Sequence, residues 1–259
     1  MLIILGILLP CLILLFSGDQ GSKSIISTTL NAIGLLIAIF LMYKGINPIL
    51  VTALSCIYIC AVTIFYQNEV NVKSKVSFIS VLLVLCIMVP VIYYTADISS
   101  IQGFTKEQYE ITDSNGYSRD IDINMIYVQI CVMIIALIGT VIDIAVAVSS
   151  SMYEIYNNSP DIKKNQLFIA GMNVGKDVMG TMVNTLILAY AGSSIPMLLL
   201  FMAYETELSK VFNLDVVATE VVRSMAGSIG LILTIPITAF IASYLIKEKK
   251  KDISREEKA

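Results

Sequence analysis

The aspartate at position 143 stands inside a long apolar stretch, where a carboxylate is costly to hold. Its surroundings read Gly-Thr-Val-Ile-Asp-Ile-Ala-Val-Ala-Val over 139–148. A carboxylate at the centre of a membrane-spanning helix costs about 2.5 to 3.5 kcal/mol on insertion scales, and such residues commonly mark ion or proton pathways. Asp143 is therefore predicted to face the interior of a helix bundle and to carry a proton. The other interpretation is a neutral Asp143 that hydrogen-bonds to a neighbouring helix.

Helical spacing places further groups on the same face as Asp143. Relative to Asp143, the offsets −4, +4, +7 and +11 are occupied by Gly139, Ala147, Ser150 and Glu154. These offsets form one stripe of a helix with 3.6 residues per turn. Glu154 then lies about 16 Å along the helix from Asp143. Two acids with serines between them predict the start of a hydrated proton or cation path, although Glu154 is also explained as a solvated interfacial residue.

A second polar stripe lies in the next apolar stretch. Asp177, Thr181 and Asn184 recur at i, i+4 and i+7, with Gly180 beside them. Because adjacent spans joined by an inside loop normally pack antiparallel, this stripe is predicted to face the helix of Asp143. Lining of the path and simple interhelical hydrogen bonding both remain open for these residues.

Glycine, serine and proline interrupt the apolar pattern at several points. The segment Gly192-Ser193-Ser194-Ile195-Pro196 predicts either a hinge beside an outer cavity or a simple interfacial turn. A short helix on the inner leaflet, beginning at Pro160, is predicted to end at Gly171 and Gly175. Glycines expected to permit close helix packing are Gly139, Gly171, Gly175, Gly180, Gly227 and Gly230.

The composition excludes much enzyme chemistry. The chain of 259 residues is 57% hydrophobic and 14% charged, whereas a soluble domain carries about 25% charged residues. It has no histidine and five cysteines, all within apolar runs. Catalytic triads with histidine and histidine-containing zinc sites are therefore excluded. No cofactor and no metal are expected, and the net charge of −3 offers no basic face for nucleic acid.

The apolar runs predict an all-α polytopic membrane protein with about seven transmembrane helices, since one span needs about 20 apolar residues. The run 195–204 is too short to cross and is predicted to be a re-entrant or interfacial half-helix. An outer amphipathic helix is predicted over 205–225. The predicted spans are 1–16, 25–43, 48–66, 76–96, 124–152, 177–192 and 226–246.

Basic residues orient these spans, because Lys and Arg accumulate in cytoplasmic loops. With the half-helix not crossing, 12 of the 17 Lys and Arg lie on one side. The amino terminus is thus predicted outside and the carboxyl terminus in the cytoplasm. The predicted organisation is N-terminal transmembrane helices 1 to 4 over 1–96, an acidic extracytoplasmic loop over 97–123, a transmembrane core over 124–246 and a basic cytoplasmic tail over 247–259.

Three stretches of the second half form a recognisable pattern: GTVIDIAVAVSSSMYEI over 139–155, AGMNVGKDVMGTMVNTLILAYAGSSIPMLLL over 170–200 and GSIGLILTIPIT over 227–238. This pattern resembles the YibE/F-like family of bacterial integral membrane proteins, in its shorter type, and it covers residues 125–246. The resemblance implies a permease-like protein. A weaker likeness is to the transmembrane core of SecDF and RND-type proton-driven proteins, in which Asp143, Glu154 and Gly192-Ser193-Ser194 would take corresponding places.

These observations favour a proton- or cation-coupled transport component of the bacterial plasma membrane. In this hypothesis Asn184, Thr181 and Ser150 orient Asp143, and Glu154 and Asp177 line the cytoplasmic mouth. The alternative is a non-transporting subunit that scaffolds a partner membrane protein. Besides the lipid bilayer, the expected partner is a longer YibE/F-type paralogue or a second copy of the chain. An enzyme is not expected, because an intramembrane aspartyl protease needs two such aspartates.

Overall fold

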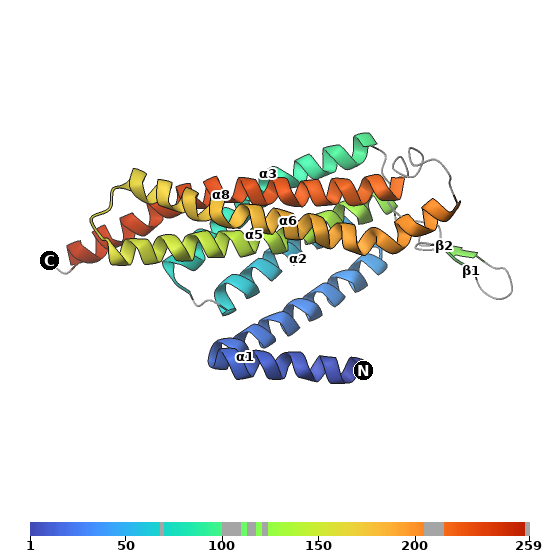
Figure 1. Ribbon diagram of the computed structural model, residues 1–259, viewed down its shortest axis with the longest axis horizontal. Helices are drawn as coiled ribbons and strands as arrows, with labels where there is room; N and C mark the ends of the chain where they lie inside the picture. The colour runs from blue at the N-terminus through green and yellow to red at the C-terminus, as the bar shows by residue number, and fades with distance from the viewer. Residues whose placement is uncertain (68–69, 100–109, 113–117, 121–123, 205–214, 257–259) are drawn as a thin grey trace.

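Long helices make up most of this computed structural model, which describes residues 1–67, 70–99, 110–112, 118–120, 124–204 and 215–256. Two short strands, β1 (Glu110–Thr112) and β2 (Ser118–Asp120), pair antiparallel at one end of the molecule (Figure 1). The helices are α1 (Leu2–Tyr43), α2 (Pro48–Ala61), the π-helical segment η1 (Val62–Tyr66) that continues α2, α3 (Val72–Ser99), α5 (Met125–Asn158), α6 (Lys164–Tyr204) and α8 (Asp215–Glu256).

Six helical segments of the described chain are long and apolar enough to cross a membrane. This confirms the predicted all-α polytopic membrane class. These six segments correspond to the seven predicted spans, because the first two, 1–16 and 25–43, are the two arms of α1 and are counted there as one segment. That helix bends at Gly18, whose φ of 51° is a conformation that glycine adopts at no steric cost. The two arms of α1 fold back beside each other in Figure 1.

Asparagine side chains start two of the membrane helices. The Asn47 side chain accepts a hydrogen bond from the Ile49 N–H at 3.0 Å, and Pro48 occupies the first helical position of α2. Asn124 accepts in the same way from the Ile126 N–H at 3.0 Å, where α5 begins. These caps satisfy backbone donors that the first turn of a helix leaves unpaired.

The helices α3, α5, α6 and α8 form the main bundle, and α1 packs on α2 and η1 to one side of it. The helix α5 contacts α2, α3, α6 and α8, so it is the centre of the fold. Its two sides belong to two buried apolar clusters. One joins it to α2 and α3 through residues such as Ile138, Val141 and Ala145, and the other joins it to α6 and α8 through Ile144, Val148 and Met152.

The helix α6 is continuous from Lys164 to Tyr204, and this corrects two predictions. It does not end at Gly171 and Gly175, and 195–204 is the last part of the same helix rather than a separate half-helix. The Ser193 and Ser194 hydroxyls donate to the Tyr190 carbonyl at 2.8 and 2.9 Å. A proline such as Pro196 is tolerated within a membrane helix when neighbouring groups, including serine side chains, satisfy the backbone groups that it frees.

The helix α8 corrects a third prediction. Its first residues, 215–225, were expected to belong to a separate helix lying in the outer interface. Instead they continue without a break into the last membrane span. The remainder of that predicted helix, 205–214, and most of the acidic loop 97–123 lie outside the described residues, as do 257–259 of the tail.

Glycines allow close packing between α5, α6 and α8. Met152 of α5 lies against Gly171 of α6, Ile235 of α8 lies against Gly175, and Leu137 of α5 lies against Gly230 of α8. At Gly227 an added Cβ would sit 3.1 Å from the Leu186 side chain. The packing role predicted for these four glycines is therefore confirmed. By contrast, a Cβ added at Gly139 or Gly180 would meet no side chain or neighbouring helix of the described chain within 4 Å. The prediction that these two glycines pack against another helix is therefore wrong within the single chain.

We expect Gly175→Ala to destabilise the protein, because its new methyl group would overlap the Ile235 side chain. Overpacking of this kind costs about 1 to 3 kcal/mol. Thermal unfolding in detergent should therefore show a lower midpoint for Gly175→Ala than for the natural chain. Gly192→Ala on the same helix is the matched control, since nothing lies within 4 Å of its added Cβ. Equal midpoints for both variants would contradict this packing.

Candidate functional site

The structure places Asp143 on the exposed face of α5. Its neighbours Ile142 and Ile144 are 3% and 0% exposed, because they point into the bundle on either side. The prediction that Asp143 faces the bundle interior is therefore wrong for the single chain. No hydrogen bond or ion pair reaches its carboxylate from any residue of the described segments.

The rest of the α5 stripe follows Asp143 as the spacing predicts, but it also faces outward. Gly139 and Glu154 are exposed, and Ala147 and Ser150 are half-buried. Two carboxylates and a hydroxyl thus share one outward face over the carboxyl-terminal half of α5. This face is continuous, and it is open to whatever surrounds the bundle.

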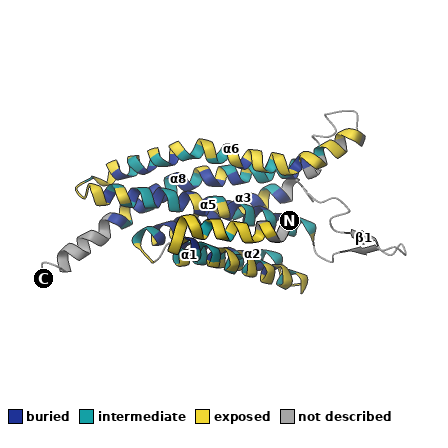
Figure 2. Cartoon of the chain, turned by 60° about the horizontal axis from the view of Figure 1, so that its bottom comes forward, coloured by how far each residue is buried: buried dark blue, intermediate teal, exposed yellow. Residues whose placement is uncertain are grey.

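The α6 stripe is exposed as well. Asp177, Gly180, Thr181 and Asn184 all lie on the outer surface of this helix, along which exposed residues run in Figure 2. The Thr181 hydroxyl donates to the Val178 carbonyl of its own helix at 2.8 Å. Asn184 has no hydrogen-bond partner among the described residues. The stripe therefore does not point into the bundle, although it was predicted to face α5.

Asp143 and the α6 stripe nevertheless lie at similar depth on neighbouring helices. Met152 packs on Gly171, and Asp143 precedes Met152 by as many positions as Gly180 follows Gly171. Because the two helices are antiparallel and each residue rises about 1.5 Å, Asp143 and Gly180 stand at about the same level. Beside them, Ile144 of α5 packs in one cluster with Val178 and Met182 of α6. The structure thus brings the two polar stripes onto adjoining helices without joining them by a hydrogen bond.

Serines bridge α3 and α5 behind the Asp143 face. The oxygens of Ser77 and Ser149 are 2.6 Å apart, and both side chains are buried. The Ser77 hydroxyl also lies within hydrogen-bond distance of the Lys73 carbonyl, at 2.9 Å. Sequence reasoning did not single out Ser77, although serines recur every third residue at 74, 77 and 80. Interhelical hydrogen bonds of this kind hold membrane helices together, so Ser149 is structural while its neighbour Ser150 belongs to the outward stripe.

A second feature is a cavity of about 440 Å³ between α6 and the first turns of α8. Its wall is mostly apolar, and Ser194 is the one residue of the predicted hinge that lines it. Gly192, Ser193 and Pro196 lie outside the lining, within the unbroken helix α6. Other lining residues include Val183, Ile187, Tyr190, Val217, Glu220 and Met225.

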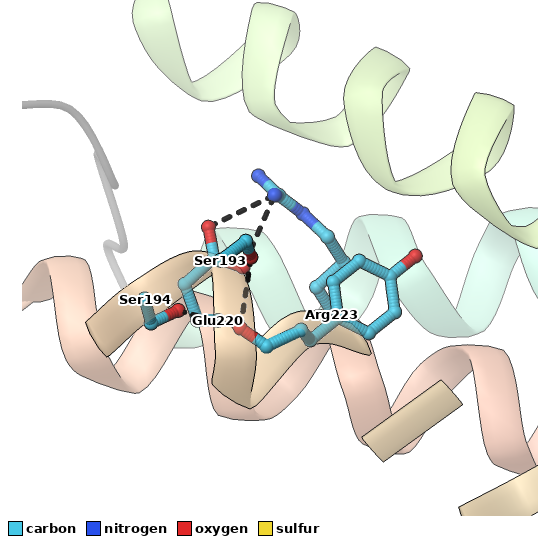
Figure 3. Close-up of polar contacts among 5 residues, drawn as sticks. Ser193, Ser194, Glu220 and Arg223 are labelled. Atoms are coloured by element: carbon cyan, nitrogen blue, oxygen red, sulfur yellow. Dashed lines mark hydrogen bonds and ion pairs between the residues drawn. The ribbon is translucent and has the colours of Figure 1, made fainter. Parts of the chain in front are cut away.

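An ion pair lies beside this cavity, because Glu220 is one of the lining residues; Figure 3 shows the pair. An Arg223 guanidinium nitrogen lies 2.8 Å from a Glu220 carboxylate oxygen, and the two side chains are only 16% and 22% exposed. The Arg223 guanidinium also lies 6.0 Å from the centre of the Tyr190 ring on α6, within range of a cation–π contact. The sequence predicted both charges on faces other than the apolar face of the amphipathic helix expected over 205–225. Their i, i+3 spacing was the available signal for the pair.

The described residues contain no group of three or more His, Cys, Asp or Glu that could hold a metal ion. Cys56, Cys60 and Cys131 are buried and Cys11 and Cys86 are exposed, all as free thiols. The polar groups of interest in the described chain are therefore the α5 and α6 stripes and the Glu220–Arg223 pair beside the cavity.

Comparison with known proteins gives one match. The family model described as YibE/F-like protein matches residues 5–248. The match extends over the first half of the chain, where the sequence had offered only hydropathy. No curated protein and no protein of solved structure matches the chain.

We expect the Glu220–Arg223 pair to contribute measurably to stability. Glu220→Ala leaves a mostly buried guanidinium without its partner, and such a loss exceeds the cost of removing both charges. A double-mutant cycle of Glu220→Ala and Arg223→Ala should give a coupling energy of about 1 to 3 kcal/mol, measured by unfolding in detergent. Additive single-variant effects would show that the pair is only a surface contact.

Proposed function

Since the chain belongs to the YibE/F-like protein family, we propose that it is a permease-like component of a proton- or cation-coupled transport system in the bacterial plasma membrane. The observation that carries this proposal is Asp143. Its carboxylate lies within a candidate membrane span, exposed and without a partner in the described chain. A charge held at such a cost commonly serves ion or proton movement.

In this proposal Asp143 alternates between the protonated and the ionised form. Ser150 and Glu154 continue its face toward the cytoplasmic end of α5, and Asp177 lies on the α6 stripe about one turn in depth from Asp143. Thr181 and Asn184 provide a hydroxyl and a carboxamide near the depth of Asp143. A carboxylate with hydroxyl and amide neighbours can pass a proton through hydrogen-bonded water, and the second acids mark where it is delivered.

The alternative function is a non-transporting subunit that scaffolds a partner membrane protein. The outward position of Asp143 favours it, because a polar residue on a lateral helix face can serve as a contact with another chain. Recovery of the chain alone from native membranes, without a companion protein at equal stoichiometry, would remove the main support for this alternative.

The proposed orientation has the amino terminus outside and the carboxyl terminus in the cytoplasm. It is supported by the distribution of Lys and Arg. The bend of α1 also supports this orientation, because it leaves the two termini at opposite ends of the bundle. The amino-terminal arm points toward the end where β1 and β2 lie, while α8 finishes at the opposite end (Figure 1).

We expect Asp143→Asn to abolish proton flux in proteoliposomes under an imposed membrane potential, because the carboxamide keeps the shape of the side chain but cannot titrate. Asp161→Asn is the matched control, since it makes the same chemical change in the exposed turn between α5 and α6. The control should retain the flux of the natural chain. Undiminished flux in Asp143→Asn, relative to empty vesicles, would reject the proposed role of Asp143.

A cysteine in place of Lys249 tests the orientation, in a background where the exposed Cys11 and Cys86 are replaced by alanine. We expect an impermeant maleimide to label Lys249→Cys only after the cells are permeabilised, because the basic tail should lie inside. Lys106→Cys in the acidic loop should react in intact cells and serves as the control. Labelling at position 249 in intact cells would mean an even number of crossings.

A further inference from the structure

The outward face formed by the α5 and α6 stripes exposes polar groups that need another surface packed against them. Asp143 and Asn184 are exposed in candidate membrane spans, and neither has a hydrogen-bond partner among the described residues. Lipid tails cannot donate or accept hydrogen bonds, so a polar group left against them keeps its full desolvation cost. Another polar surface at the same depth is the arrangement that removes this cost.

The glycines of this face indicate where a second helix can approach it closely. Gly34, Gly171, Gly175, Gly227 and Gly230 all have a side chain of the same chain within 3.1 Å of an added Cβ. Gly139 and Gly180 have open space instead, although they stand one turn from Asp143 and from Asn184 respectively. Small residues allow two helix backbones to approach closely in a membrane. Asp143 and Asn184 thus each lie one turn from a glycine at which a second helix can approach.

The chain itself carries the complement that this face requires. The α5 stripe offers an acceptor, the Asp143 carboxylate, and the α6 stripe offers a donor, the Asn184 carboxamide. Asp143 stands at the depth of Gly180, only one helical turn from Asn184. A two-fold axis along the membrane normal keeps every residue at its own depth. It can therefore bring the acceptor of one copy to the donor of the other, twice.

We propose that two copies of this chain pair through their α5–α6 faces, with α5 of one copy against α6 of the other. Asp143 accepts a hydrogen bond from Asn184 of the second copy. Gly139 and Gly180, each one turn from one of these residues, allow α5 of one copy and α6 of the other to approach closely. The interface is isologous, because the same surface serves on both sides. The polar path along α5 and α6 is then enclosed between the two copies.

This assembly does not depend on the proposed transport, since the paired face would form equally in a chain that moves no ion. If transport does occur, the second copy contributes a residue to the Asp143 site, and the site is incomplete in one chain. Proton flux and pairing are therefore measured separately, and either can fail alone.

Disulfide cross-linking in native membranes tests the pairing. Gly139→Cys and Thr185→Cys are introduced into two differently tagged copies that lack Cys11 and Cys86, and the copies are expressed together. These two positions stand at about the same depth, because Gly139 precedes Asp143 by as many positions as Asn184, the neighbour of Thr185, follows Gly180. Both new side chains fit the single chain, because nothing lies within 4 Å of a Cβ added at Gly139 and because Thr185 is exposed. We expect a disulfide-linked dimer carrying both tags, since a disulfide needs Cα atoms about 4.4 to 6.8 Å apart. Ile232→Cys on α8, which is 45% exposed, paired with Gly139→Cys is the control and should give no such product.

The outcomes decide the proposal. A cross-link between Gly139→Cys and Thr185→Cys supports it, while no cross-link, or only as much as the Ile232→Cys control gives, overturns it. A cross-link of Gly139→Cys to itself but not to Thr185→Cys would place α5 against α5 and also overturn it.

A variant that fills the open space at Gly180 provides the second measurement. Gly180→Leu should convert the purified dimer to a monomer on size-exclusion chromatography with light scattering, without lowering its thermal midpoint. Gly6→Leu, at an equally open glycine of α1, should leave the dimer intact. A Gly180→Leu protein that stays dimeric would exclude this face as the interface.

Discussion

A bilayer offers no hydrogen bonds to the groups that it surrounds, and the architecture of this protein follows from that constraint. Its backbone is held in long helices, in which the internal N–H and C=O groups pair with one another. Several polar groups of the membrane helices have a partner within the chain: Ser194 donates to Tyr190, and Ser77 contacts Ser149 on the next helix. The charges of Glu220 and Arg223 neutralise each other beside the cavity between α6 and α8. Asp143 and Asn184 differ from these groups, because they are exposed in candidate membrane spans and have no hydrogen-bond partner in the described chain.

That exception links structure to function. A carboxylate at the centre of α5 is costly for any membrane protein, and its cost is lowest when another polar surface covers it. The same covering surface would shield the stripe that runs through Ser150 to Glu154 from lipid. Assembly and ion movement, which are separate proposals, are thus connected by one physical requirement at Asp143.

The membrane helices were predictable because about 20 apolar residues are needed to cross a bilayer, and runs of that kind are visible in the sequence. Helix continuity was less predictable. Glycines and prolines that end helices in water are tolerated in membrane helices, so Gly171, Gly175 and Pro196 lie inside α6 rather than at its ends. At Gly18 the helical run resumes directly after a bend, so the first two predicted spans are the two arms of α1 with no loop between them.

The direction in which a stripe faces could not be read from its spacing. The 3.6-residue period correctly placed Gly139, Asp143 and Glu154 on one face, but lipid is as apolar as the bundle core, so hydropathy does not distinguish outward from inward. The contact of Arg223 with Tyr190 was also out of reach, since it joins residues of different helices. Only the i, i+3 pairing with Glu220 had a local signal.

The account depends most on the claim that the Asp143 carboxyl is satisfied by a second chain. Solid-state NMR on mixed samples measures this contact in the natural sequence. One preparation carries ¹³C-labelled aspartate, another carries ¹⁵N-labelled asparagine, and the two are mixed in detergent and reconstituted into one membrane. We predict a through-space signal between the Asp143 carboxyl carbon and the Asn184 side-chain nitrogen that disappears in Asn184→Ala. Its absence from the mixed sample, with both labels resolved, would contradict the account.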